Sequence, residues 1–276
     1  MVHIILTGAT GFLGTAVLQH ILSLPASNPI SKLSILSRSP VPLATNTSPP
    51  NFKRTNTTTN INVITHADYT TYPPEILSQL SDASAVIWAQ GISTTAVSSA
   101  AEYRRITYDF PLAAAKALAS ARSADAKSPL RFIYVSGEGV THTPGMFTQM
   151  FAKVKGEAEK ALLALPQQQA YSGRLDVLCP RPGGILSNDP KEIQKMLQTK
   201  TTSMKYFMKT VLPVYRALKP GMLIDREDLG RVLVEMALRE VDGRDVVRYA
   251  GMKETSCEGR VLQNVALREL GGLEKV

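Results

Sequence analysis

Short apolar runs alternate with longer segments of helical periodicity up to about residue 185, and this alternation constrains the fold more than any other feature of the chain. Strands that alternate with helices form a parallel sheet covered by helices. The runs at 85–89 and 132–135 are apolar almost throughout, as expected for strands that are buried on both faces. The sequence therefore predicts an α/β fold with a doubly wound parallel sheet.

The hydrophobic pattern also locates the individual elements. Strands are expected at residues 2–7, 32–38, 61–66, 84–90, 130–136 and 174–180. Helices are expected at residues 11–24, 74–80, 98–122 and 148–165. After residue 185 the pattern is mostly helical, with expected helices at 189–199, 203–218, 226–238 and 256–270 and a short strand at 246–250.

A glycine-rich turn, Thr7-Gly8-Ala9-Thr10-Gly11-Phe12-Leu13-Gly14, joins the first expected strand to the first expected helix. Glycine at 8 and 11 permits a tight turn and a close approach of backbone amides to a pyrophosphate, and Gly14 lets the helix pack against the strand. The first N–H groups of the helix would face the bound anion. We therefore predict a Rossmann fold whose turn binds a dinucleotide; a glycine-rich turn without a ligand is the alternative.

The glycine-rich turn and the change of pattern near residue 185 together predict the organisation of the chain. Residues 1–185 are expected to form a dinucleotide-binding Rossmann domain. Residues 186–276 are expected to form a small, mostly helical substrate or lid region that packs on this domain as a single compact unit. Ligands of doubly wound folds bind beyond the carboxyl ends of the strands, where a late segment can cover the substrate.

The second expected strand ends in Leu36-Ser37-Arg38-Ser39. An acidic residue at this position would accept hydrogen bonds from the ribose hydroxyls of NAD, whereas an arginine pairs with the 2′-phosphate of NADP. Arg38 therefore predicts NADP (NADPH) as the cofactor and makes NAD the less favoured one. A solvated surface arginine is the alternative.

The glycine-rich turn resembles the cofactor signature of the short-chain dehydrogenase/reductase superfamily, in its extended or atypical branch. Within that branch the chain is similar to the oxidoreductase family named for a human Tat-interacting protein. Further matching segments lie at 135–139, 154–159, 181–185, 212–215 and 222–231. The resemblance implies cofactor contacts in the turn and beyond it, at Thr7, Gly8, Thr10, Gly11, Phe12, Leu13, Gly14, Asp68, Gln90, Gly91, Lys155, Pro182 and Gly183. Ordinary turn chemistry is the alternative for the contacts that follow strands three, four and six.

The catalytic residues depart from the pattern of the superfamily, which pairs a serine after strand five with Tyr-x-x-x-Lys on the next helix. Ser136 and Lys155 match, but Phe151 occupies the position of the tyrosine. The missing phenol would donate a proton to the substrate oxygen, and such help is worth about 10²–10⁴-fold in rate. His142, in the loop after strand five, is a candidate replacement, whereas Glu138 is expected to face solvent.

Phe151 also fits a different role. It belongs to an apolar stripe at helical spacing that a helix would bury in the core. The stripe consists of Phe147, Phe151, Val154, Ala158, Leu162 and Leu165. Core packing is therefore the alternative to a position in the active-site cleft.

The net charge of the chain is +8, from 31 basic and 23 acidic residues. The basic stripe with interleaved aromatic residues that a nucleic-acid-binding protein carries is missing. We expect a small-molecule substrate and no nucleic acid, and an anionic substrate would suit the charge. Basic residues concentrate between Lys191 and Lys219. The amphipathic segment 203–218 fits a weak contact with a membrane surface, and a lid helix with its lysines in water is the alternative.

The remaining features exclude several classes of protein. The two cysteines, Cys179 and Cys257, form no CxxC pair, and the four histidines are scattered, so no metal site is expected. No stretch approaches the ~20 apolar residues of a transmembrane segment, and the apolar run at 2–6 is too short for a signal peptide. We expect a cytoplasmic protein, and the sequence leaves its oligomeric state open.

The sequence therefore favours an NADP-binding oxidoreductase of the atypical short-chain dehydrogenase/reductase type that acts on an unknown small molecule. Two further classes stay open because Phe151 replaces the tyrosine. One is a non-catalytic, NADP-sensing regulatory or scaffold protein, and the other is a non-redox isomerase or lyase on the same fold. Analogy with a superfamily does not separate the three.

Overall fold

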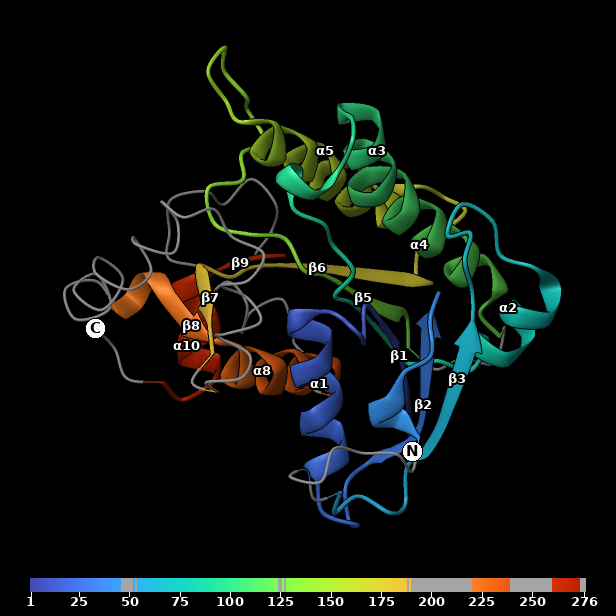
Figure 1. Cartoon of the computed structure of the whole chain (residues 1–276). Coiled ribbons are helices and arrows are strands. Elements are labelled where there is room, and N and C mark those ends of the chain that lie inside the picture. Colours follow the sequence, from blue (N-terminus) through green and yellow to red (C-terminus); the bar gives the residue numbers. More distant parts are fainter. Residues whose placement is uncertain are drawn as a thin grey trace.

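The computed structural model describes residues 1–45, 52, 54–123, 126, 128–187, 189, 220–238 and 260–273. Its main feature is a seven-stranded sheet with the strand order β3-β2-β1-β4-β5-β6-β9, in which every neighbouring pair is parallel (Figure 1). The strands are β1 (Val2–Thr7), β2 (Ile30–Ser37), β3 (Asn60–Thr65), β4 (Ala85–Trp88), β5 (Leu130–Tyr134), β6 (Leu175–Arg181) and β9 (Val261–Gln263). The predicted doubly wound parallel sheet is confirmed.

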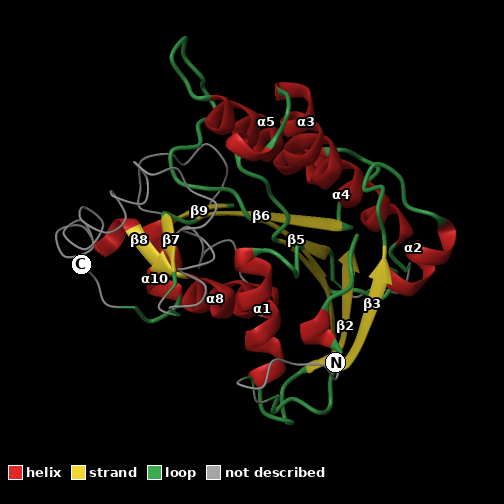
Figure 2. Ribbon diagram, in the orientation of Figure 1, coloured by secondary structure: helices red, strands yellow, loops and turns green. Residues whose placement is uncertain are grey.

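Helices cover both faces of this sheet (Figure 2). Side chains of α1 (Phe12–Ser23) and α8 (Arg226–Leu238) form one hydrophobic core with the sheet, and those of α4 (Phe110–Ala121) and α5 (Met150–Ala164) form the other. The strand order reverses beside β1, which lies between β2 and β4. In an open parallel sheet this reversal opens a crevice at the carboxyl ends of the strands, where ligands bind.

The expected helix at 98–122 is interrupted. It consists of α3 (Ala100–Arg104), a π-helical turn (Arg105–Asp109) and α4. Pro111, at the start of α4, has no N–H to donate to the carbonyl of Thr107 four residues earlier. The hydroxyl of Tyr134 on β5 donates to that carbonyl instead, at 2.9 Å. The interruption therefore has a local cause in the sequence.

The later part of the chain differs from its expected pattern. Residues 261–263 of the helix expected at 256–270 form β9, and α10 (Asn264–Leu270) begins only after them. Two unexpected strands, β7 (Gly184–Leu186) and β8 (Leu223–Asp225), pair in parallel. The division of the chain into two regions at residue 185 stays a prediction. Two elements that follow residue 185, β9 and α8, belong to the main sheet and its core.

Other expected elements cannot be compared with the structure. The helices expected at 189–199 and 203–218 and the strand expected at 246–250 lie outside the described residues. α2 (Pro74–Leu80) lies where a helix was expected. In the part of the chain that the structure describes, no helix combines the length and the apolar character that a membrane span needs.

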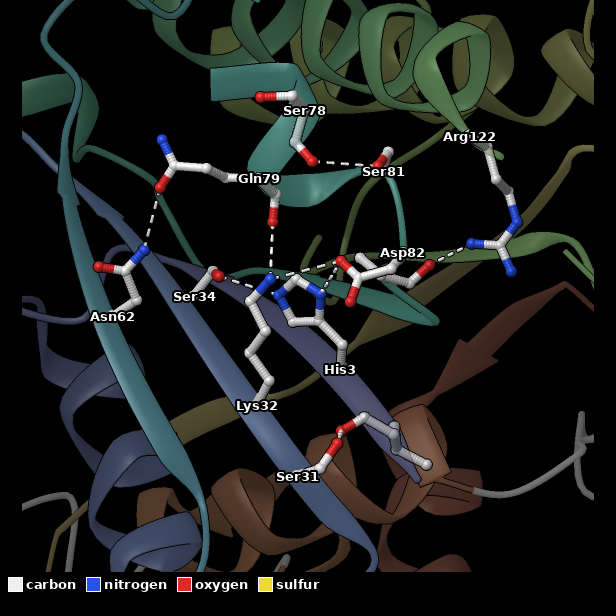
Figure 3. A network of polar contacts seen from close by, with 12 residues as sticks. His3, Ser31, Lys32, Ser34, Asn62, Ser78, Gln79, Ser81, Asp82 and Arg122 are labelled. Atoms are coloured by element: carbon white, nitrogen blue, oxygen red, sulfur yellow. Dashed lines mark hydrogen bonds and ion pairs between the residues drawn. The ribbon is translucent and has the colours of Figure 1, made fainter. Parts of the chain in front are cut away.

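A partly buried polar network joins His3 on β1 and Lys32 and Ser34 on β2 to Asp82 (Figure 3). The imidazole of His3 contacts Asp82 at 2.7 Å through Nδ1 and Ser34 at 2.9 Å through Nε2. Lys32 donates to the Gln79 carbonyl at 2.9 Å. The order serine–histidine–aspartate is that of a hydrolase triad, but the side chain of Ser34 is fully buried. The network therefore ties strands together and offers no accessible nucleophile.

This network leads to a prediction about acid sensitivity. Burial lowers the pKa of His3 in spite of the Asp82 carboxylate, and burial also lowers the pKa values of His20 and His66. Below about pH 6.5 the unfolded chain therefore binds protons that the folded chain does not, and the stability present above that pH is lost. We expect the free energy of unfolding, measured by urea titration, to fall from pH 7 to pH 5.5, by at most ~1.4 kcal/mol per pH unit for each histidine. A free energy that is constant or rises on acidification would contradict this expectation.

Candidate active site

The glycine-rich turn runs against the carboxyl end of β4. Gly8 has φ +72°, a conformation that favours glycine, and a Cβ atom there would lie 2.6 Å from the Ala89 carbonyl oxygen and 2.8 Å from the Gln90 nitrogen. The amide of Gly11 donates to the Gly8 carbonyl at 2.8 Å and closes the turn. The structure thus places the backbone of Gln90 beside the turn.

The turn leads directly into α1. A Cβ atom on Gly14 would lie only 2.0 Å from the Gly8 carbonyl oxygen, so the first turn of the helix touches the loop before it. Gly11 is the N-cap residue and brings no side chain to the first N–H groups of α1. Such groups bind anions. Thr7 Oγ1 is buried and has no hydrogen-bond partner among the described residues. Turn and helix end therefore fit the pyrophosphate of a dinucleotide.

The ends of β2 and β3 hold the residues expected at the adenosine half of the cofactor. Arg38 is exposed directly after β2. Asp68 is exposed after β3, and its carboxylate accepts hydrogen bonds from the amide of Thr70 at 3.0 Å and from the hydroxyl of Thr71 at 3.1 Å. Hydrogen bonds from Thr70 are the main cause of the lowered pKa of Asp68. The alternative that we named for Asp68, ordinary turn chemistry, is present in the structure.

Ser136 and Lys155 meet beyond the carboxyl end of β5. Ser136 is 4% exposed, and its Oγ has no hydrogen bond of ordinary geometry to any described residue. Nζ of Lys155, on α5, donates to the carbonyl oxygen of Ser136 at 2.9 Å and to that of Val135 at 3.4 Å. Burial lowers the pKa of Lys155 to about 8, and the Glu159 carboxylate opposes this shift. The structure therefore brings together the two residues that match the superfamily.

Phe151 lies one helical turn before Lys155 on α5 and is half-buried. Its Cζ atom would be 3.9 Å from a Cβ atom on Gly139, so the loop after β5 passes over the ring. Most of the proposed apolar stripe is buried, at Val154, Ala158, Leu162 and Leu165. Phe147 departs from it, because its side chain is 95% exposed in the loop before α5.

Glu159 is fully buried one turn after Lys155 and was not predicted as part of the site. Its carboxylate accepts hydrogen bonds from Arg181 Nε at 3.0 Å and from an Arg181 terminal nitrogen at 2.6 Å, and it contacts His142 Nε2 at 2.6 Å. Burial disfavours the charged carboxylate, but the His142 and Arg181 contacts outweigh it and lower the pKa of Glu159. The Ser136 hydroxyl also favours the charged form.

His142 lies farther from the cleft than its place in the sequence suggested. It lines a cavity of about 520 Å³ together with Lys160, Leu163, Asp176 and Arg260. Neither Ser136 nor Lys155 lines this cavity. His142 lines this cavity and also contacts Glu159, which is buried one helical turn after Lys155.

Pro182 and Gly183 form the turn between β6 and β7. The Gly183 amide donates to Asn264 Oδ1 at 2.9 Å, and the Glu138 amide donates to the Pro182 carbonyl at 2.8 Å. Glu138 is exposed, as expected, but its Oε2 atom would lie 2.8 Å from a Cβ atom on Gly183. Partial burial raises the pKa of the Glu138 carboxyl. Gly91, after β4, faces open space.

Comparison with known proteins assigns the chain to a family. The leucinostatins biosynthesis cluster protein T of Purpureocillium lilacinum is 30% identical over 282 residues, which cover 96% of this chain and 94% of the relative. The chain belongs to the family of this protein. A second family member, the botcinic acid biosynthesis cluster B protein 16 of Botryotinia fuckeliana, is 32% identical over 164 residues, covering 59% of this chain and 98% of the relative. No family model matches the sequence.

Solved structures identify the fold of this family. A short-chain type dehydrogenase/reductase from Mycobacterium ulcerans matches with a TM-score of 0.59 and 15% identity, covering 96% of this chain and 90% of that one. WbmF of Bordetella bronchiseptica, solved in complex with NAD+, matches with a TM-score of 0.56 and 14% identity, covering 100% and 80%. The resemblance to the short-chain dehydrogenase/reductase superfamily is confirmed at the level of the fold.

Proposed function

We propose that this member of the leucinostatins cluster protein T family is an NADP-dependent oxidoreductase of the short-chain dehydrogenase/reductase type. The observation that carries the proposal is the position of Lys155 Nζ, 2.9 Å from the carbonyl of Ser136, which follows β5 at the same carboxyl edge of the parallel sheet as the glycine-rich turn after β1. The glycine-rich turn, Ser136 and Lys155 come from three separate places in the chain: the end of β1, the end of β5 and α5. Both relatives carry names of biosynthesis clusters, so we propose a biosynthetic small molecule as the substrate.

In this proposal the chain holds the dinucleotide along the carboxyl edge of the sheet. The glycine-rich turn, through the backbone around Thr7, Gly8, Thr10, Gly11, Phe12, Leu13 and Gly14, binds the pyrophosphate. Arg38 binds the 2′-phosphate. Asp68, Gln90, Gly91, Pro182 and Gly183 border the remaining cofactor. When bound, NADPH supplies a hydride to the substrate, or NADP+ accepts one.

Ser136 and Lys155 act on the substrate side. The Ser136 hydroxyl, which has no hydrogen bond of ordinary geometry within the described structure, is the group that would donate to a substrate oxygen in this proposal. A buried polar group without a partner is costly, and a ligand oxygen would remove that cost. Lys155 contacts the nicotinamide ribose. These roles need no residue from outside the described structure.

The cofactor preference tests the proposal. Arg38 makes charge-assisted hydrogen bonds to a 2′-phosphate, and such bonds are worth about 1.5–3 kcal/mol, or roughly 10–100-fold in affinity. Fluorescence titration is expected to give NADPH a dissociation constant at least tenfold below that of NADH. Arg38→Glu should remove or reverse this preference. Lys116→Glu, the same charge change at an exposed position on α4, should leave it intact. Equal affinities of the unaltered protein for NADPH and NADH would refute the assignment of NADP.

Phe151 favours a second candidate function, a protein that senses NADP without turning it over. The phenol that normally donates the proton is absent, which is expected to slow reduction by about 10²–10⁴-fold unless another acid acts. Oxidation of NADPH by 9,10-phenanthrenequinone discriminates between the candidates. Tight NADPH binding without any quinone-dependent oxidation would favour the sensor, or a non-redox isomerase or lyase.

A further inference from the structure

The absence of a phenol at position 151 raises the question of which group donates the proton in the proposed reaction. Within the described structure the candidate donors other than Lys155 are Glu159, His142 and Glu138. Glu159 has its oxygens bound by Arg181 and His142. The His142 imidazole is held on Glu159 and lines a cavity that neither Ser136 nor Lys155 borders. The Glu138 carboxylate lies against the Gly183 turn.

Lys155 differs from these groups because it has a proton to spare. An ammonium group carries three N–H bonds. The carbonyls of Ser136 and Val135, at 2.9 and 3.4 Å, take two of them, and no other hydrogen bond of Nζ exists within the described residues. One N–H of Lys155 therefore has no acceptor among the described residues, and Nζ is held at the backbone of Ser136, the residue whose hydroxyl would orient the substrate in the proposed function.

We propose that Lys155 is the general acid of this site and donates the proton that the tyrosine donates elsewhere in the superfamily. The inference rests on the proposed oxidoreductase function and deepens it. In the reductive direction a bound nicotinamide dinucleotide would supply the hydride that the carbonyl carbon accepts, and the carbonyl π electron pair would move onto oxygen. An N–H bond of Lys155 breaks, its electron pair stays on nitrogen, and an O–H bond forms. Water then returns a proton to the neutral amine.

The charges around Lys155 suit this role. Glu159 on α5 is the acidic group that faces it, but this carboxylate is ion-paired with Arg181 on β6 and hydrogen-bonded to His142 in the loop after β5. The hydroxyl of Tyr134 on β5 is bonded to the Thr107 carbonyl. Burial can therefore lower the pKa of the ammonium to about 8, which allows proton exchange near neutral pH. An ordinary lysine, with a pKa near 10.4, would be a far weaker acid.

The first test measures Lys155 directly in the cofactor-free protein. With ¹³C-labelled lysine, the Cε resonance that disappears in Lys155→Arg belongs to Lys155, and its shift can be followed from pH 6 to pH 11. The expected midpoint is about 8. Lys153 is the internal control, because it is exposed on the same helix. A midpoint of Lys155 at or above that of Lys153 overturns the inference.

The second test separates proton donation from cofactor positioning. Turnover of NADPH with 9,10-phenanthrenequinone should fall as pH rises through about 8, because the acid form is the active one. Lys155→Arg keeps the positive charge but does not release a proton in this range. It should lose at least tenfold in kcat, as expected for loss of a general acid, and a smaller factor in NADPH affinity, which is measured in parallel because Lys155 also contacts the cofactor in the proposed function. Lys155→Met should lose as much, whereas Lys153→Met should match the wild type.

The outcomes distinguish the inference from the proposed function. Wild-type kcat in Lys155→Arg, with an unchanged pH profile, removes the inference alone. NADPH binding without quinone-dependent oxidation in the wild type removes the proposed function and the reaction that Lys155 would serve. If Lys155→Met does not fold, the arginine variant and the resonance midpoint still decide.

Discussion

Gly11→Val is expected to weaken NADPH binding at least a hundredfold while the melting temperature changes by only a few degrees. Gly11 has an ordinary extended conformation, so a side chain causes no backbone strain there. Its Cβ atom would lie 3.2 Å from the Gly8 carbonyl oxygen, a contact that a small shift relieves. The valine methyl groups, however, would stand over the first N–H groups of α1, where the pyrophosphate binds. NADPH fluorescence titration and thermal denaturation measure the two effects.

A matched variant controls for the added side chain. Gly145 lies in the exposed loop before α5, and a Cβ atom there would meet no other atom within 4 Å. Gly145→Val should therefore leave both NADPH affinity and melting temperature unchanged. A folded Gly11→Val protein that binds NADPH with unchanged affinity would place the cofactor elsewhere and refute the proposed role of the turn.

The glycine-rich turn could be predicted from the sequence because its residues are contiguous and because Gly8 and Gly14 each occupy a position that only glycine fits. Gly8 needs a positive φ beside β4, and Gly14 needs a backbone contact that excludes a Cβ atom. The pairing of Ser136 with Lys155 was implied by the resemblance to the short-chain dehydrogenase/reductase superfamily. A strand end and a helix register fix the two positions, and parallel strands bring both to one edge of the sheet.

The buried carboxylate network could not be predicted in the same way. Glu159 carries a signal, because it lies four residues after Lys155 and so shares its face of α5. Arg181 lies on β6, and nothing local in the sequence indicates that α5 packs close enough for an ion pair. β9 was missed for a related reason. Three residues are too few to show a strand period, and pairing with β6 decides their conformation.

Glu159→Gln is expected to destabilise the protein by about 3–5 kcal/mol, because it removes the negative charge from a buried ion pair with the guanidinium of Arg181. Arg181 is 3% exposed and Glu159 is fully buried, so water cannot replace the lost partner. For a chain of this size the loss corresponds to a decrease in melting temperature of roughly 10 °C or more. Thermal denaturation at pH 7 measures it. Glu157 lies on the same helix as Glu159 and forms a partly exposed pair with Arg104 of α3. Glu157→Gln, which breaks this pair, should cost less than about 1 kcal/mol.

The pH dependence of this difference identifies its electrostatic origin. The pKa of Glu159 is lowered in the folded protein, so its contribution is fully present above the carboxyl's ordinary pKa of about 4.5 and is lost as pH falls through the lowered folded value. Wild type and Glu159→Gln should therefore approach each other in stability below pH 4. A difference that stays constant from pH 7 down to pH 3.5 would mean that packing, and not the charge of Glu159, holds α5 against β6. In that case the same carboxylate could not be the charge that opposes the effect of burial on Lys155.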